Sequence, residues 1–291
     1  MINNHTDILG HLDAMIDQEE TTRYFNYFKR DAQCDINEEC RKAMVTWVTH
    51  VQTTLSLSPE TVWIAMSFFD RYLSSGRGNS QEVLKSKCKF QLAAITVFYT
   101  AVKIYEPVVL GIDMLIQLSR GMYKKSDIVE MEKDILSALD WRVSNHTPMD
   151  FARYLLELLP GQVPSYDSVS LLEICQEHVD FAVTDIYFSC CTPSVVGISC
   201  LASSLTQSYN LSLLEKQALW VTLSELCHFD LSPKEVIAAR QRLLSHALPC
   251  KPDTVSKLAT LSQSNIAVSA YSMDGESSSS PICVIKTARQ A

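Results

Sequence analysis

The sequence has 291 residues, 47% of them hydrophobic and 20% charged, so it encodes a folded chain larger than one typical domain. Only 8 residues are glycine, about 3% against a usual ~7%. This disfavours sheet-rich and phosphate-cradling folds, which need glycine in turns and loops. The formal net charge of −8 argues against nucleic acid as the main partner. We therefore expect an all-α protein whose partners are other proteins.

The first thirty residues contain no cationic start followed by an apolar run, so they do not resemble a secretory signal. The most apolar stretch, residues 90–102, is shorter than the ~18 residues that suggest a membrane span. We therefore expect a protein of the nucleus and cytoplasm that has no membrane partner.

Four pairs of a hydroxyl residue and proline each precede an amphipathic run, a pattern typical of helix starts. They are Ser58-Pro59, Thr147-Pro148, Thr192-Pro193 and Ser232-Pro233. Glu235 follows Ser232 at the spacing of a capping box. These marks and the apolar periodicity predict two sets of five helices, at about 38–56, 59–74, 81–106, 112–118 and 126–140, then 148–159, 166–186, 193–208, 212–228 and 232–247.

The third helix of each set is rich in small residues, such as Ala93 and Ala94 in the first and Gly197 and Ser203 in the second. Small side chains let helices approach closely, so each third helix is predicted to be central. The resulting organisation is an extension over 1–21, a domain over 22–145, a second over 146–248, and a Ser-rich flexible tail over 249–291.

The usual catalytic motifs for phosphate, serine-hydrolase and zinc-protease chemistry are absent from the sequence. The ten cysteines form no CxxC pair and lie mostly in apolar helical segments, which favours buried free thiols. Cys175 with His178, and Cys227 with His228, are the best metal candidates, but their spacing is weak for a tetrahedral site. We expect no catalytic residues, no metal and no cofactor.

Two segments, CRKAMVTWVTHV (40–51) and FFDRYLSS (68–75), are followed by QLAAITVFYTAVKIYE (91–106) and YKKSDIVEMEKDILSALDWRV (123–143). In this order and spacing they resemble a cyclin box, and the second half resembles the C-terminal box of D-type cyclins. The resemblance covers residues 22–247. It implies two tandem five-helix cyclin boxes that activate a cyclin-dependent kinase and control cell-cycle progression at G1/S.

Five positions typical of the cyclin box are occupied, namely Arg41, Asp70, Leu92, Lys103 and Glu132. The resemblance implies that Arg41 and Asp70 form a buried structural pair and that Lys103 and Glu132 reach the kinase. The residues themselves support the pair, because a charge among apolar neighbours is tolerated mainly when it is paired. From the pattern alone, Lys103 and Glu132 read as solvated surface residues.

The positions matching Leu136, Trp141 and Val143, with Ile104 beside Lys103, form in cyclins an exposed apolar ridge for the kinase's regulatory helix. An apolar ridge rimmed by charge is typical of a protein interface. Core packing is the alternative explanation for the same stripe.

The resemblance also implies a docking patch for substrate or inhibitor proteins that carry Arg-x-Leu peptides, formed here by Met44, Trp47 and Gln91. Cys40 stands where such cyclins have methionine, and His50 where they have an acid. Without that acid the peptide's arginine lacks its ion-pair partner, which argues against strong docking.

In the tail, Ser280 precedes Pro281, the minimal pattern read by proline-directed kinases. Ser280 is therefore a candidate phosphosite, with an inert tail as the alternative. Two other classes compete with the cyclin interpretation as a whole. A two-box helical transcription-factor-like adaptor is disfavoured by the acidic charge, and a prenyl-diphosphate synthase by the missing acidic cluster.

Overall fold

The computed structural model describes residues 2–20, 26–29, 36–143, 146–158, 165–208, 211–226 and 233–246. Every regular element in these ranges is helical, which confirms the predicted all-α fold. The helices of the first half are α1 (Ile2–Glu20), η1 (Tyr27–Lys29), α2 (Glu38–Thr54), α3 (Glu60–Ser75), α4 (Ser80–Leu84), α5 (Lys87–Tyr105), α6 (Ile112–Leu118) and α7 (Lys125–Ala138). Those of the second half are α8 (Pro148–Leu158), α9 (Ser165–Thr184), α10 (Ile186–Ser189), α11 (Pro193–Gln207), α12 (Leu213–Leu226) and α13 (Pro233–His246).

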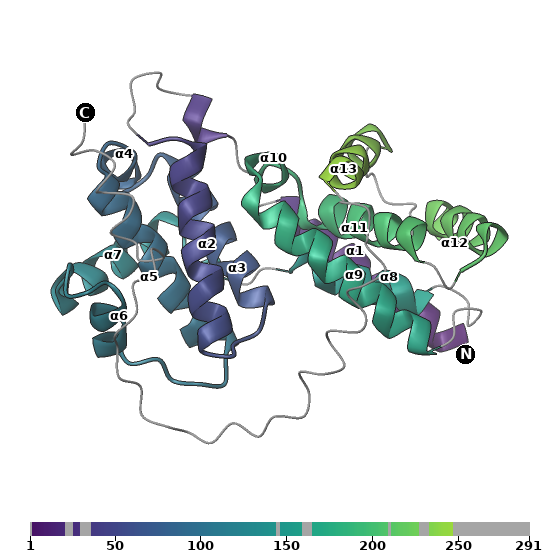
Figure 1. Ribbon diagram of the computed structural model, residues 1–291, viewed down its shortest axis with the longest axis horizontal. Coiled ribbons are helices and arrows are strands. Elements are labelled where there is room, and N and C mark those ends of the chain that lie inside the picture. The colour runs from purple at the N-terminus through teal and green to yellow at the C-terminus, as the bar shows by residue number, and fades with distance from the viewer. Residues whose placement is uncertain are drawn as a thin grey trace.

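The helices gather in two groups, α2–α7 on one side of the molecule and α8–α13 on the other (Figure 1). Helix α5 packs against α2, α3, α4 and α7, and helix α11 packs against α8, α9, α12 and α13. Residues on every face of both helices are buried. The prediction of one central helix in each set is therefore confirmed.

The close approach of α11 to α8 depends on Gly197. A Cβ atom on this residue would lie 2.5 Å from the carbonyl oxygen of Pro148 and 2.9 Å from Cβ of Phe151, both far inside van der Waals contact. Ser203 on the same helix is fully buried and donates its hydroxyl to the carbonyl of Ser199 at 2.8 Å. Small side chains thus set the spacing of the second helix group.

Helices begin at or one residue after each of the four predicted prolines. The Ser58 and Thr147 hydroxyls accept backbone N–H groups of the first helical turn, at 3.3 and 3.2 Å. Thr192 makes no such cap and instead contacts the hydroxyl of Ser194. Ser232 lies outside the described residues.

The single helix predicted over 81–106 is wrong, because the structure contains two helices there. α4 ends at Leu84 and α5 begins at Lys87, where the Ser86 hydroxyl accepts the N–H of Lys89 at 3.4 Å. The sequence KSK at 85–87 has no proline or glycine, and only the serine marks the break.

The sequence analysis predicted an extension over residues 1–21 and did not predict helix α1, which occupies this region. Its spacing of Leu12, Met15 and Glu19 is helical, and the first two side chains are 0% and 1% exposed. α1 packs against α8, and the Glu19 carboxylate accepts the N–H of Ser194 at 3.0 Å at the start of α11. The N-terminal helix is therefore part of the second group's packing.

None of the described helices combines the length and the apolar character that crossing a membrane requires. Of the described cysteines, Cys175 and Cys200 are buried, whereas Cys88 and Cys190 are exposed. Burial raises the pKa of the Cys200 thiol well above its ordinary value, which makes this thiol unreactive.

Candidate functional site

Lys103, near the end of α5, and Glu132, in the middle of α7, bind each other. The Lys103 ammonium lies 2.9 and 3.0 Å from the two carboxylate oxygens of Glu132. Thr100, one turn earlier on α5, donates its hydroxyl to Glu132 Oε1 at 3.0 Å. Lys103 is 44% exposed and Glu132 15%. The sequence suggested two separate surface charges, and the structure joins them in one ion pair.

The four apolar residues predicted to accompany this ion pair differ in exposure. Ile104 is 44% exposed and Trp141 66% exposed, while Leu136 and Val143 are half-buried. The Tyr105 hydroxyl donates to the carbonyl of Val143 at 2.5 Å, which ties the end of α5 to the segment after α7. The six predicted partner-binding residues all lie on α5, on α7 or in the segment after α7. This set is called here the α5–α7 surface, and its members are Lys103, Ile104, Glu132, Leu136, Trp141 and Val143.

Trp141 is held outward by a strained backbone. Asp140 and Trp141 have φ of 52° and 58°, a left-handed conformation that is uncommon for residues other than glycine. Asp140 is ion-paired to Arg77 at 2.5 Å, and the N–H of Trp141 donates to the carbonyl of Leu136 at 2.9 Å. Strain of this kind persists only where surrounding contacts enforce it, and it clusters at functional sites.

Sequence reasoning missed further exposed apolar residues beside this surface. Val108 and Val109, in the segment after α5, are 50% and 97% exposed. Val129 is 49% exposed and lies one turn before Glu132 on the same face of α7. The apolar VVL run between Pro107 and Gly111 was a signal that could have marked the first two.

Arg41 and Asp70 form a bidentate ion pair between α2 and α3. The distances are 2.9 Å from Nε to Oδ1 and 2.7 Å from Nη2 to Oδ2, and the side chains are 2% and 1% exposed. The Tyr27 hydroxyl also donates to Oδ1 of Asp70, at 2.8 Å. The third arginine nitrogen, Nη1, donates to the carbonyl of Val183 on α9 at 2.9 Å. The pair therefore joins the two helix groups as well as α2 and α3.

The three residues of the predicted docking patch lie inside the protein. Met44, Trp47 and Gln91 are 1%, 5% and 0% exposed, and the Trp47 ring packs edge-on against Phe98. The three side chains are therefore buried in the free chain, and their role as a docking patch stays a prediction. Leu92, the remaining family position, is also buried.

Gln91 has an unusual environment. Neither its amide nitrogen nor its amide oxygen has a hydrogen-bond partner among the residues that the structure describes. A buried amide without partners costs about 1–3 kcal/mol, and such groups call for an explanation.

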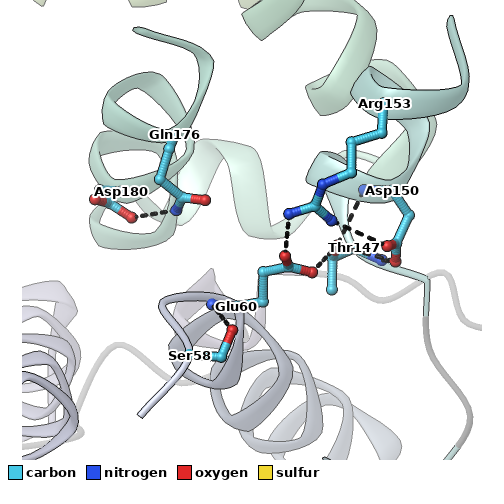
Figure 2. Close-up of polar contacts among 7 residues, drawn as sticks. All are labelled: Ser58, Glu60, Thr147, Asp150, Arg153, Gln176 and Asp180. Carbon is cyan, nitrogen blue, oxygen red and sulfur yellow. Dashed lines mark hydrogen bonds and ion pairs between the residues drawn. The ribbon is translucent and has the colours of Figure 1, made fainter. Parts of the chain in front are cut away.

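A polar cluster joins the two helix groups (Figure 2). Glu60 at the start of α3 accepts hydrogen bonds from the Thr147 hydroxyl at 3.0 Å and from the Arg153 guanidinium of α8. The bond to Glu60 raises the pKa of Arg153. Nearby on α9, Gln176 donates to Asp180 at 2.7 Å, and burial raises the pKa of Asp180. The Glu60 contacts therefore connect the start of α3 with Thr147 and α8, whereas the Gln176–Asp180 bond lies within α9.

No group of three or more potential metal ligands occurs among the described residues. The candidate pair Cys175 and His178 is buried within α9, while Cys227 and His228 fall outside the described residues. Ser280, the candidate phosphosite, also lies outside them.

Residues 11–144 match the family model described as the cyclin, N-terminal domain. This range contains the α5–α7 surface, the Arg41–Asp70 pair and the three predicted patch residues. The match therefore covers every predicted site residue except Ser280.

Among curated proteins, the chain is 26% identical over 209 residues to the G1/S-specific cyclin-D2 of Rattus norvegicus, covering 70% of this chain and 69% of the relative. It is 28% identical over 208 residues to the G1/S-specific cyclin-D1 of Danio rerio, covering 70% and 68%. It is also 29% identical over 170 residues to the G2/mitotic-specific cyclin-2 of Antirrhinum majus. That alignment covers 57% of this chain, and the chain spans only 36% of the plant protein.

Among solved structures, the fold is similar to that of a viral cyclin from herpesvirus saimiri. The TM-score is 0.61 at 19% identity, with 81% of this chain and 97% of the viral chain covered. At this identity the likeness concerns the fold, which extends through both helix groups.

Proposed function

Since the chain belongs to the cyclin family through its N-terminal domain, we propose that it is the activating subunit of a cyclin-dependent protein kinase. In this role it has no catalytic site of its own. The two helix groups are then the two cyclin boxes, and the kinase binds at the α5–α7 surface.

The observation that carries this proposal is the Lys103–Glu132 ion pair, together with the exposed side chains of Ile104, which follows Lys103 on α5, and Trp141, which follows α7. An apolar contact area with a small number of oriented charges is typical of a specific protein interface. Exposed Trp141 on a strained backbone fits the role of an anchor residue, since tryptophan is enriched among the residues that dominate binding energy.

The mechanism is a shift of the kinase between two conformations. The α5–α7 surface would contact the kinase's regulatory helix only in the arrangement that pairs the catalytic lysine with its glutamate. Binding energy then favours the competent state, because a ligand shifts an equilibrium by its difference in affinity for the two states. An interface of at least ~1,000 Å² is expected.

A second role is supported by Gln91. We propose that its unpaired buried amide binds the backbone of a substrate or inhibitor peptide once Trp47 and Met44 move aside. The missing acid at His50 predicts weak selection for arginine in that peptide. Gln91→Leu is expected to raise the melting temperature, because it removes an unsatisfied amide, and to reduce peptide binding.

The timing and location are also proposals. The alignments to D-type cyclins of animals cover about 70% of the chain, which supports a role at G1/S, although a mitotic relative also matches over a shorter range. We propose that the protein works in the nucleus and cytoplasm. Phosphorylation at Ser280 would then be carried out by a proline-directed kinase of the class that the chain activates.

The test is to mix the purified chain with a panel of purified cyclin-dependent kinases and measure phosphorylation of histone or retinoblastoma substrates. The proposal predicts a stable 1:1 complex and activation of at least one kinase. Absence of any complex, together with binding to promoter DNA, would favour the two-box transcription adaptor instead.

A further inference from the structure

The second helix group contains an open groove between α11, α12 and α13. Its volume is about 450 Å³, within the range of ligand-binding clefts. The groove is lined by Ala202, Leu205, Thr206, Leu213, Lys216, Gln217, Val221 and Arg240. Helix α12 lies at the opposite end of the molecule from α6 and α7 (Figure 1), so the groove does not belong to the α5–α7 surface.

The lining residues of α12 share one face of the helix. Leu213, Lys216, Gln217 and Val221 follow the spacing i, i+3, i+4 and i+8. Helical residues at this spacing lie on one face of the helix, and such a face is normally buried by packing against a neighbouring helix. Here Leu213 and Val221 remain 72% and 51% exposed, and Leu214 on the rim is 77% exposed. Apolar side chains of α12 are therefore exposed along the groove.

The floor of the groove comes from α11. Ala202 and Leu205 are buried at 1% and 3% exposure, and Thr206 follows one position later on the same face. Thr206 donates its hydroxyl to the carbonyl of Ala202 at 2.9 Å. The groove is therefore lined by buried apolar residues of α11, exposed apolar side chains of α12 and the hydroxyl residue Thr206.

Two cations converge on Thr206 from opposite sides. Lys216 on α12 donates to the Thr206 carbonyl at 3.0 Å, and Arg240 on α13 donates to the Thr206 hydroxyl at 2.7 Å. Within the described residues, no ion pair involves Lys216. The adjacent Glu215 carboxylate is turned to the N–H of Ser212 at 2.7 Å. In a chain of net charge −8, this edge is positively charged.

We propose that the groove binds a short amphipathic helix of a partner protein, with apolar side chains at i, i+4 and i+7 and an acidic side chain between them. The nine residues from Leu213 to Val221 span eight steps of 1.5 Å, about 12 Å, which matches about two turns of such a helix. The apolar side chains fill the open face of α12. The carboxylate lies between Lys216 and Arg240, where charge-assisted hydrogen bonds are strong. This is the helix-in-groove mode of recognition, and it does not depend on kinase activation.

The test uses two fluorescein-labelled synthetic 12-residue helical peptides with leucine at positions 2, 6 and 9. One carries glutamate at position 5 and the other lysine, and the remaining positions are alanine and glutamine in both. Fluorescence polarisation with the full-length chain should show at least tenfold tighter binding of the glutamate peptide. The preference should weaken with added salt, because exposed charges are screened.

Three variants locate the binding. Lys216→Glu should reverse the preference between the two peptides, and Val221→Asp should weaken both peptides at least tenfold. Lys234→Glu, which changes an exposed lysine of α13 that does not line the groove, should leave both affinities unchanged. The charge reversal is informative even if Val221→Asp impairs folding, because a misfolded protein cannot gain affinity for the lysine peptide.

Equal affinity for the two peptides, or an unchanged preference in Lys216→Glu, would overturn the proposal. Two other occupants would also overturn it. One is the chain's own tail. It would be the occupant if a synthetic peptide of residues 247–291 displaces the labelled glutamate peptide at a lower concentration than unlabelled glutamate peptide does. The other is a second copy of the chain, if sedimentation shows a dimer that Val221→Asp dissociates.

Discussion

Lys103 on α5 and Glu132 on α7 bind each other in the free chain, at 2.9 and 3.0 Å. Partly exposed ion pairs of this kind contribute only about 0–1 kcal/mol. A partner that offers its own charged or polar groups can therefore open the pair at little cost. Thr100 also bonds to Glu132, so the carboxylate is positioned before any partner arrives. Breaking the ion pair thus costs little free energy, while the Glu132 carboxylate already has a defined position. Both properties favour binding of a partner at this site.

Arg41→Ala should lower the free energy of unfolding by about 3–5 kcal/mol, because it leaves the buried Asp70 carboxylate without its cation. It also removes the bond from Arg41 to the carbonyl of Val183. Urea unfolding measures the change. Arg77→Ala is the matched control, since the Arg77–Asp140 pair is more than half exposed on both sides and its loss should cost under about 1 kcal/mol. Equal effects of the two variants would contradict the structural role of the buried pair.

Gly197→Ala should destabilise the protein by about 1–3 kcal/mol, because the added methyl group overlaps the carbonyl of Pro148. Gly10→Ala in α1 is the control, since nothing lies within 4 Å of the position that its Cβ would take. In a helix interior this second change should stabilise by about 0.5–1 kcal/mol. Thermal unfolding that shifts in the same direction for both variants would show that α8 and α11 are not in close contact.

The helices that were predicted correctly are those whose signals are local. Pro59, Pro148 and Pro193 mark helix starts in the sequence, and the small residues of α11 mark its central place. The break at Ser86 was missed because a single serine cap competes with strong apolar periodicity on both sides. α1 was missed because its short apolar stripe gains its stability from tertiary packing.

The candidate site also depends partly on local sequence and partly on contacts between distant helices. Resemblance to cyclins identified Lys103 and Glu132, but their mutual bond depends on the distance between two helices, which no local pattern encodes. The burial of Trp47 and Gln91 likewise follows from how α2 meets α5. Apolar residues at helical spacing look the same in the sequence whether they face a neighbour or solvent.

The pH dependence of stability should reflect His178. This side chain is 6% exposed, and its Nε2 has no hydrogen-bond partner among the described residues. Burial lowers its pKa, and a hydrogen bond with Gln207 offsets this only in part. The unfolded chain therefore takes up a proton more readily than the folded one. The free energy of unfolding is therefore highest above about pH 6.5, the pKa of a histidine in the unfolded chain, where the His178 ring is neutral in both states. It decreases as the pH falls below this value.

Melting temperatures measured from pH 7.5 to pH 5.5 check this prediction. His178→Gln should lose less stability over that range than the wild type does. His50→Gln, a change at an exposed position of α2, should follow the wild-type curve. A wild-type melting temperature that rises on acidification, or that falls equally in His178→Gln, would be inconsistent with a neutral buried histidine.

Trp141→Ala should weaken kinase association about 10- to 100-fold, the usual range for a central tryptophan at an interface. Because the side chain is 66% exposed, its removal should leave the melting temperature nearly unchanged. Val169→Ala, at a position that is 59% exposed on α9, should have no effect on association. Surface plasmon resonance with an immobilised kinase gives both affinities, and equal values for these two variants would remove Trp141 from the interface.

The most direct measurement compares two double variants in the same kinase-binding and activation assay. Lys103→Ala with Glu132→Ala should abolish association and activation while leaving the melting temperature within about 2 °C of the wild type. Lys89→Ala with Glu82→Ala removes an exposed ion pair between α5 and α4, at the other end of α5, and should activate the kinase normally. A Lys103/Glu132 double variant that still co-purifies with a fully active kinase would contradict the assignment of the α5–α7 surface.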